Sequence, residues 1–302
     1  MARQRLISGF LMFNVPLTFF YRCNWKDEKL RRSVMAEFAA NGAKHLVLSN
    51  SLIDEILGNI TMMDTFSREM AEAGLSFLDA HAPFGQFMDL NNPEERLRKQ
   101  IIRRHLLHID IAADMGVDTI TIHTGNEYYY PQVSMDKQIS LIVEALDKLL
   151  PAAEERKVTV CIENIWCRLN TPEKLLEIKS KFPTDTLGFC FDAGHANNVA
   201  KGHLYERNSV YDSYILTGTP AEYDDQVQEK MLPHIVNCHL HDNDGQFDTH
   251  CNVFDGNTDW EKVVRLLRQA PKLKCIQSEV IPDKHNIAIR TLCEAFEKLG
   301  NL

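Results

Sequence analysis

One short segment concentrates side chains that bind transition metals. It reads HLHDNDGQFDTH over residues 239–250, with three histidines and three aspartates, and it follows the apolar run Ile235 to Cys238. Imidazole and carboxylate groups together are the ligands that divalent transition metals take in proteins. A solvated acidic loop explains the aspartates but does not need the histidines. The segment therefore predicts a metal site, with a polar surface loop as the alternative.

Residues of the same kinds stand at or just past the ends of other short apolar runs. The candidate metal ligands are His81, His123, Glu163, Asp192, His195, His239, Asp248, His250 and Glu279. A lone histidine at such a place is more often a hydrogen-bonded core residue than a ligand. Several carboxylates buried together, with no Lys or Arg at these positions, need a cation. A bound metal supplies that charge, and nine candidates are too many for one ion.

The remaining histidines lie mostly where helices or the starts of strands are expected, or in a loop. They are His45, His105, His108, His203, His234, His241 and His285. We assign no metal to them.

The elements that must position the candidates alternate regularly along the chain. Strands are expected at residues 6–13, 45–49, 75–82, 119–123, 158–165, 187–192, 235–239 and 275–280. Amphipathic helices are expected at residues 27–40, 62–73, 93–116, 134–155, 172–181, 221–231, 260–269 and 285–299. Eight such units predict an α/β fold, a single (β/α)8 TIM barrel spanning residues 1–302 as one domain. Because all strand ends of a parallel barrel meet at one face, the candidates should converge there.

Two connections are longer than the others, at residues 197–220 and 241–259. Extra residues in a barrel usually lengthen the loops in which sites are built. Four aromatic residues flank the motifs, and we interpret them either as surfaces for the C–H faces of a sugar or as ordinary rim and core residues. They are Phe84, Trp166, Phe247 and Trp260.

Composition limits the class of protein and its partners. The chain of 302 residues is 44% hydrophobic and has a formal net charge of −9, so polyanions are repelled at long range. Its eight cysteines form no CxxC pair, which favours reduced thiols. Neither a signal peptide nor an apolar run long enough to span a membrane is found, so we expect a cytoplasmic protein. Lys201, His203 and Arg207 could meet a phosphate or carboxylate, but we favour a solvated loop.

Seven short motifs carry a resemblance to a known family. In chain order they are HAPF, TIHTG, CIEN, FDAGHAN, HLHDND, FDTH and QSEV. Together they resemble the xylose isomerase-like TIM barrel superfamily, which includes sugar (phosphate) isomerases and epimerases and the AP endonuclease type 2 enzymes. The resemblance implies that Glu163, Asp192, His239 and Glu279 hold a divalent metal, manganese, magnesium, cobalt or zinc. It also implies that Glu163 and Glu279 act as acid and base.

The endonuclease branch offers a second interpretation. By resemblance, three ions would be held by all nine candidates, with Glu163 shared by the first two ions. The chain departs from that branch in Asp242, Asn243 and Asp244, where the endonucleases carry a lysine-bearing segment, and in Gly194, where they carry a cysteine. We interpret the two aspartates as repelling a phosphodiester backbone. The loops also lack the Lys and Arg residues that grip DNA.

These features lead to a ranked set of hypotheses. The first is a divalent-metal-dependent isomerase or epimerase of a small carbohydrate, with proton transfer through an enediolate. The second is a multinuclear-metal phosphoesterase, and the third is a barrel that binds a sugar or metal without turnover. Because both Glu163 and Glu279 are present, we rank the third hypothesis last. Nucleic acid is disfavoured as a partner, and the oligomeric state is left open, a homo-oligomer included.

Overall fold

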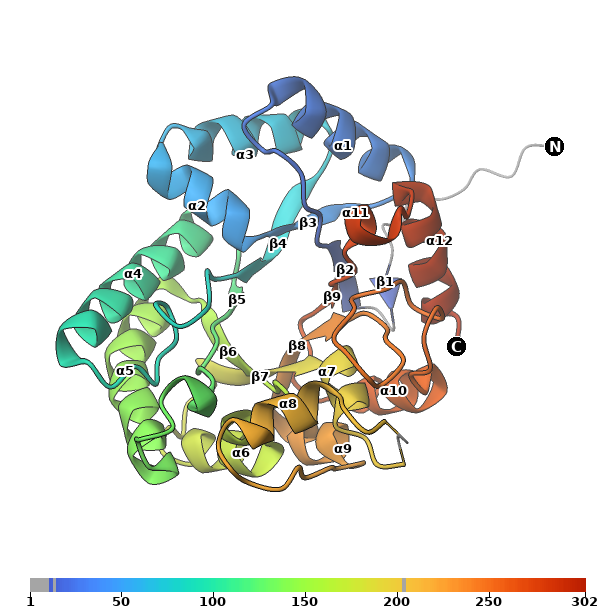
Figure 1. Ribbon diagram of the computed structural model, residues 1–302. Helices are drawn as coiled ribbons and strands as arrows, with labels where there is room; N and C mark the ends of the chain where they lie inside the picture. Colours follow the sequence, from blue (N-terminus) through green and yellow to red (C-terminus); the bar gives the residue numbers. More distant parts are fainter. Residues whose placement is uncertain (1–10, 13–14, 203–204) are drawn as a thin grey trace.

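Eight parallel strands close into a barrel in the computed structural model, which describes residues 11–12, 15–202 and 205–302 (Figure 1). The barrel strands are β2 (Val15–Phe19), β3 (His45–Leu48), β4 (Ser76–His81), β5 (Thr119–Thr121), β6 (Thr159–Glu163), β7 (Leu187–Asp192), β8 (Ile235–Leu240) and β9 (Cys275–Ser278). Each strand pairs in parallel with the next, and β2 also pairs in parallel with β9. The chain therefore has the predicted TIM barrel fold.

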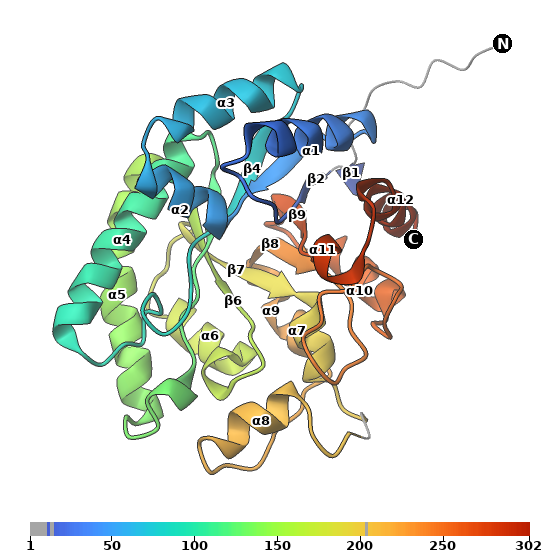
Figure 2. The ribbon, with the colours of Figure 1, turned by 45° about the horizontal axis from the view of Figure 1, so that its top comes forward.

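Helices cover the outside of the barrel, as Figures 1 and 2 show. They are α1 (Glu28–Ala40), α2 (Asn50–Gly58), α3 (Met62–Glu72), α4 (Glu95–Asp114), α5 (Met135–Arg156), α6 (Pro172–Lys179), α7 (Ala193–Asn198), α8 (Ser209–Ile215), α9 (Val227–Met231), α10 (Trp260–Leu267), α11 (Pro282–His285) and α12 (Ile289–Gly300). Short 3-10 turns lie at Glu127–Tyr129, Arg168–Asn170 and Leu232–His234. Because helices lie over them, strands such as β6, β7 and β8 are buried along their whole length.

The first strand differs from the sequence prediction. Residues 6–10 and 13–14 of the expected strand lie outside the described residues, and Leu11–Met12 forms the short strand β1, antiparallel to β2. The first barrel strand is Val15–Phe19, which lies between the expected strand and the first expected helix. Pro16 interrupts the apolar run in the sequence, but a proline is tolerated near the beginning of a strand, where it costs few ladder hydrogen bonds.

The helices differ from the prediction in three places. The helix before β8 begins at Val227 rather than at residue 221, and the insertion that precedes it carries α7 and α8. Helix α2, between β3 and α3, was not predicted. The last expected helix is divided into α11 and α12, with Asn286 between them in the left-handed conformation.

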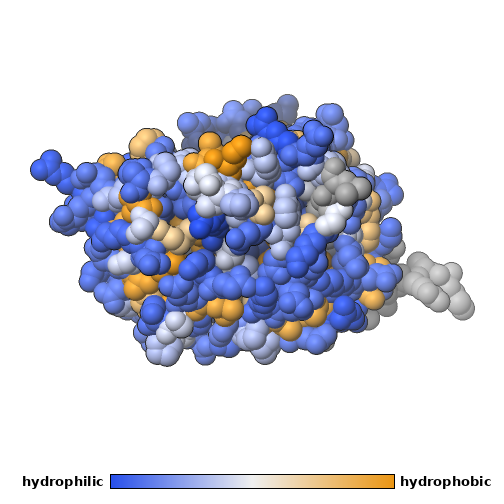
Figure 3. Space-filling model, turned by 60° about the horizontal axis from the view of Figure 1, so that its bottom comes forward, coloured by the Kyte–Doolittle hydropathy of each residue, from blue (hydrophilic) through white to orange (hydrophobic). Residues whose placement is uncertain are grey.

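In the part of the chain that the structure describes, no helix has both the length and the apolar character to cross a bilayer. Figure 3 shows a mostly hydrophilic face with apolar side chains scattered over it. Scattered exposed apolar residues are ordinary for a globular protein.

Candidate metal centre

Four predicted ligands come together at the carboxyl ends of β6 to β9, and we call them the first centre. Glu163, Asp192, His239 and Glu279 each offer one ligand atom, and these atoms lie within 4.8 Å of one another. The Nδ1 atom of His239 is 3.5 Å from Glu163 Oε1, 3.3 Å from Glu279 Oε2 and 3.9 Å from Asp192 Oδ2. Strand ends that are far apart in the sequence thus meet at one point, as the barrel topology predicts.

The donor atoms of the first centre fit a metal better than they fit one another. The Nδ1 atom of His239 and the Oε2 atom of Glu163 are buried and have no hydrogen-bond partner. Oε2 of Glu163 is 3.2 Å from Nε2 of His123, but the two atoms do not meet in hydrogen-bond geometry. Buried polar atoms without a partner are costly. Atoms directed at a common point rather than at each other are the arrangement that a bound cation requires.

Asp192 is held in place by the end of its own strand. Its Oδ1 atom caps α7 by accepting a hydrogen bond from the backbone N–H of His195 at 2.6 Å. The side chain of Asn164 clamps the backbone of Asp192, donating to its carbonyl at 2.9 Å and accepting from its N–H at 2.8 Å. The capping bond leaves Oδ2 of Asp192 directed toward the centre.

Four more donors form a second centre beside the first. His195, His241, Asp248 and His250 bring one ligand atom each within 4.8 Å of the others. Asp248 lies among the three rings: its Oδ2 is 2.9 Å from Nε2 of His250 and 3.5 Å from Nε2 of His195, and its Oδ1 is 3.7 Å from Nε2 of His241. The Oδ1 atom of Asp248 is buried without a hydrogen-bond partner. Imidazole and carboxylate donors in this ratio suit zinc and similar ions.

Backbone carbonyls fix which nitrogen of three histidines faces the centres. Nδ1–H of His81 donates to the carbonyl of Ala82 at 2.8 Å, and Nδ1–H of His250 donates to the carbonyl of Glu279 at 2.8 Å. In His195, Nδ1 is 2.9 Å from the carbonyl of Asn164. A histidine that donates from one ring nitrogen presents the other as a ligand, which is the usual arrangement around protein-bound metals. Nε2 is therefore the ring atom that each of these histidines turns toward the centres.

The remaining two predicted ligands extend the first centre toward β4 and β5. His81, His123 and Glu163 form a third group of donors within 4.8 Å, so Glu163 belongs to two groups. Nε2 of His81 is 3.9 Å from Glu163 Oε2 and 3.9 Å from Glu279 Oε1. Burial and the nearby His123 lower the pKa of His81 to about 4, which keeps its ring neutral. The structure thus brings all nine predicted residues together at the barrel mouth.

The carboxylates and imidazoles of the barrel mouth shift one another's pKa values because they are buried close together. Burial alone would raise the pKa of Glu163 and Glu279, but His239 brings both well below their usual range. Burial would likewise lower the pKa of His195 and His250, but Asp248 helps to raise both, that of His250 to about 9. The carboxylates are therefore held ionised.

His241 is a residue of the mouth that the sequence analysis set aside. We had assigned it no metal, yet its ring is buried, stacks on His250 with centroids 3.8 Å apart, and lies with Nε2 3.1 Å from Asp192 Oδ2. A signal was present, because His239 and His241 are two residues apart and side chains two apart in a strand share a face.

Gly194 makes the space that the ring of His241 occupies. A Cβ atom added at Gly194 would lie 2.0 Å from Cε1 of His241, closer than any real contact. Gly194, which departs from the endonuclease motif, therefore leaves the room that the ring of His241 needs.

The position of Asp242 contradicts the interpretation that this residue repels a phosphodiester backbone. It is fully buried and accepts hydrogen bonds from Phe254 N at 3.0 Å, Trp260 Nε1 at 2.8 Å and Thr258 Oγ1 at 2.6 Å. A carboxylate enclosed in this way organises the loop after β8 and cannot repel a ligand at the surface. Asp244 is exposed, as expected.

The flanking aromatic residues divide into two kinds. Trp260 is buried beside Asp242 and belongs to the core. Phe84 is 52% exposed and stacks on His123 at 4.6 Å, while Trp166 packs edge-on against His195 at 4.8 Å. Phe247 is exposed on the loop that carries Asp248. Phe84 and Trp166 therefore border the metal centre.

Comparison with known proteins agrees with the fold. The uncharacterized protein MJ1311 of Methanocaldococcus jannaschii is 28% identical over 199 residues, which cover 63% of this chain and 59% of that protein, so the match spans less than two thirds of its length. A D-tagatose 3-epimerase-like protein has a similar structure, with a TM-score of 0.68, 18% identity and coverage of 94% of this chain and 98% of that one. The IOLI protein with a binding zinc atom also has a TM-score of 0.68, at 14% identity, with coverage of 94% and 96%. At such identities the structures show a shared fold.

The family itself is matched over most of the chain. Residues 34–287 match the family described as xylose isomerase-like TIM barrel, and these residues include all the described donors of both centres. The chain belongs to the xylose isomerase-like TIM barrel family.

Proposed function

We propose that the protein is a divalent-metal-dependent isomerase or epimerase of a sugar, a sugar phosphate or a related polyol carbonyl compound. The observation that carries the proposal is the convergence of Glu163, Asp192, His239 and Glu279 at one buried point, where Oε2 of Glu163 and Nδ1 of His239 have no hydrogen-bond partner. The likeness to a D-tagatose 3-epimerase-like protein and to a zinc-containing structure supports it.

The first centre would hold one divalent ion, manganese, magnesium, cobalt or zinc. When bound, such an ion supplies Lewis-acid polarisation of a carbonyl and of the hydroxyl next to it. Three carboxylates and one imidazole form its donor set, and oxygen-rich sets of this kind accept all four metals.

Glu163 and Glu279 would remove a proton from the carbon next to the carbonyl and return it, acting from opposite faces of the substrate. Both flank the same two rings: each has an oxygen 3.9 Å from Nε2 of His81 and another within 3.5 Å of Nδ1 of His239. Because both carboxylates are held ionised, either can accept a proton from carbon at neutral pH. The partially exposed Glu279 would meet the substrate more directly than the fully buried Glu163.

The second centre would take an accessory ion. Its four protein donors would suit a structural ion, because structural zinc sites are usually held by four protein side chains. His241 supplies the fourth donor. This set therefore favours a structural or electrostatic role for the second ion.

A multinuclear-metal phosphoesterase is the alternative. It is favoured by the sharing of Glu163 between two donor groups, because two ions that share a carboxylate can clamp a phosphate. The closed donor set of the second centre and the net charge of −9 weigh against this function.

Solvent deuterium exchange tests the proposal. Protein loaded with manganese, and separately with zinc, would be incubated in D2O with a panel of ketoses and ketose phosphates, and deuterium at carbon would be followed by NMR. We expect incorporation at the carbon next to the carbonyl of at least one sugar. Absence of exchange with every sugar, accompanied by release of phosphate from an ester, would replace the isomerase with the hydrolase.

A further inference from the structure

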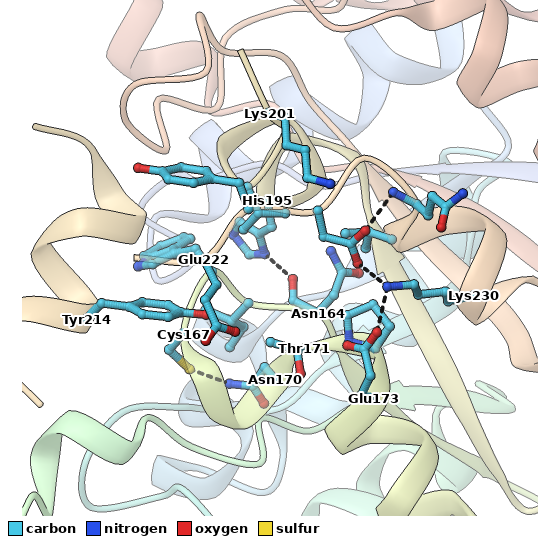
Figure 4. Close-up of a pocket in the computed structure, with 18 residues that line it drawn as sticks. Asn164, Cys167, Asn170, Thr171, Glu173, His195, Lys201, Tyr214, Glu222 and Lys230 are labelled. Carbon is cyan, nitrogen blue, oxygen red and sulfur yellow. Dashed lines mark hydrogen bonds and ion pairs between the residues drawn. The ribbon is translucent and has the colours of Figure 1, made fainter. Parts of the chain in front are cut away.

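A second cavity lies beside the metal centre. It has a volume of about 310 Å³ and is bounded by the loop after β6, the beginning of α6 and the insertion that carries α8 and leads to α9 (Figure 4). Small-molecule sites in proteins commonly begin near this size. We call it the lateral pocket.

His195 connects the lateral pocket to the metal centre. Its Nε2 atom faces Asp248 at 3.5 Å and its Nδ1 atom is 3.1 Å from Glu163 Oε1, yet the same ring lines the pocket together with Trp166. None of the four donors of the first centre lines the pocket. His195 therefore lies between the metal centres and the pocket, and a group held in the pocket would be separate from the reacting carbons.

The walls of the pocket suit a neutral polyhydroxy group. In Figure 4, Tyr214 and Glu222 lie on one side, Lys230 and Glu173 on the other, and His195 and Asn164 between them. Aromatic faces supplied by Trp166 and Tyr214 can cover the C–H faces of a sugar ring. Carboxylate and ammonium groups along the same wall can bond hydroxyls, which both donate and accept.

The charges of the pocket disfavour an anion. Lys230 is occupied by Glu173 at 2.6 Å and by Asp224 at 2.8 Å. Among the described residues, Lys201 and Glu222 line the pocket without forming an ion pair with any partner. The lining holds three carboxylates and two ammonium groups, besides the ring of His195. A phosphate would find one free lysine and an unpaired carboxylate, whereas a hydroxyl group can use both.

From this geometry we propose that the lateral pocket binds a second, neutral sugar unit or similar polyhydroxy group, so that the substrate is a glycoside larger than a free ketose. This inference rests on the proposed function, because it places the reacting unit at the first centre. The insertion after β7, which supplies α8 and the outer wall, is then a specificity element.

The test compares ketose disaccharides with a free ketose. The probes are D-fructose, D-fructose 6-phosphate, and neutral disaccharides in which glucose or galactose is linked to O1, O3, O4 or O6 of fructose. Binding to the metal-loaded protein is measured by calorimetry, and deuterium exchange gives kcat/KM. We expect at least one disaccharide to bind and to exchange about tenfold better than D-fructose. A tenfold change corresponds to about 1.4 kcal/mol of binding free energy.

Two variants locate the gain. Glu222→Gln removes the unpaired carboxylate of an exposed side chain, and Trp166→Ala removes the aromatic wall. Each variant should reduce the ratio of kcat/KM for the disaccharide to kcat/KM for D-fructose by about fivefold or more, mainly through the KM of the disaccharide. Glu155→Gln, on the exposed end of α5, is the matched control and should leave the ratio as in the wild type.

The outcomes separate this inference from the proposed function. If fructose exchanges as well as every disaccharide and the two variants leave the ratio unaltered, the pocket assignment is wrong while the isomerase stands. Stronger binding of D-fructose 6-phosphate than of all neutral probes also overturns it. If no probe exchanges, the isomerase fails, and calorimetry still decides whether a neutral disaccharide occupies the pocket and loses affinity in Glu222→Gln.

Discussion

Two groups of buried histidines in this protein behave in opposite ways. His105 and His108 on α4 are each 1% exposed, and His105 donates from Nε2 to the carbonyl of Met88 at 2.8 Å. Burial lowers their pKa values to about 4 and about 3. In the described part of the chain, neither forms an ion pair with a carboxylate. At the barrel mouth, by contrast, Asp248 helps to raise the pKa of the largely buried His250 to about 9.

The difference lies in the neighbours rather than in the burial. On α4, His105 bonds a backbone carbonyl and has no carboxylate beside it among the described residues, so it is a neutral core residue. The mouth instead gathers four carboxylates, Glu163, Asp192, Asp248 and Glu279, with six imidazole rings and leaves Nδ1 of His239 without a partner. Histidines therefore indicate a metal site when carboxylates are packed with them and their donor atoms lack other partners.

The largest effect expected within the mouth comes from Glu279→Gln. The substitution removes a base and a metal donor together, so deuterium exchange should fall by about 10³-fold. Asp248→Ala, which alters only the second centre, should cost less than about tenfold. Both variants are compared with wild type at saturating metal. Equal and severe losses in both would instead indicate ions that act jointly on a phosphate.

The next effect distinguishes the two centres. His241→Asn should weaken binding of the second ion by about 10- to 100-fold, because it removes one of four donors, and should leave the first ion in place. Stepwise calorimetric titration of metal-free protein with zinc measures both affinities. His241 also approaches Asp192 at 3.1 Å. Loss of the first ion with retention of the second would show that His241 serves to position Asp192 instead.

A smaller effect is expected at the α4 pair. The pKa of His105 is lowered to about 4 from an ordinary value of 6.5, so below pH 6.5 the unfolded chain binds a proton that the folded protein excludes. The stability contributed by the neutral ring is thus complete above pH 6.5 and is lost as the pH falls toward 4. The amide of His105→Gln can still donate to the carbonyl of Met88. This variant should lose about 1–2 kcal/mol less of its free energy of unfolding between pH 7 and pH 5 than the wild type does.

Urea unfolding of the metal-free protein at the two pH values measures this difference. The titratable groups of the mouth are the same in the wild type and in His105→Gln, so their contributions to the pH dependence cancel in the comparison. An unchanged pH dependence in His105→Gln would mean that His105 is already accessible to protons in the folded state.

No effect is expected with nucleic acid. At a net charge of −9, the protein should show no detectable binding to duplex DNA at physiological salt. Fluorescence anisotropy with a plain and an abasic duplex is sufficient to check it. Efficient cleavage of the abasic duplex would place the mouth among phosphoesterase sites and reverse the ranking of functions.

The sequence predicted the barrel and nine donors because both depend on short-range patterns. Apolar runs of strand length, each followed by a helical period, identify parallel units, and their topology brings the ends together. His241 and Asp242 show what such patterns miss. His241 enters the mouth only because Gly194 leaves room for its ring, and Asp242 is buried only because Phe254, Thr258 and Trp260 fold over it. Both depend on contacts between separate loops.

The metal content of three proteins tests the central claim most directly. Wild type, Asp192→Ala and His105→Gln would be equilibrated with zinc, freed of excess ion and analysed for metal per chain. The account predicts at least one equivalent in wild type and in His105→Gln, and the loss of at least one equivalent in Asp192→Ala. Undiminished metal in Asp192→Ala, or no metal in the wild type, would contradict it.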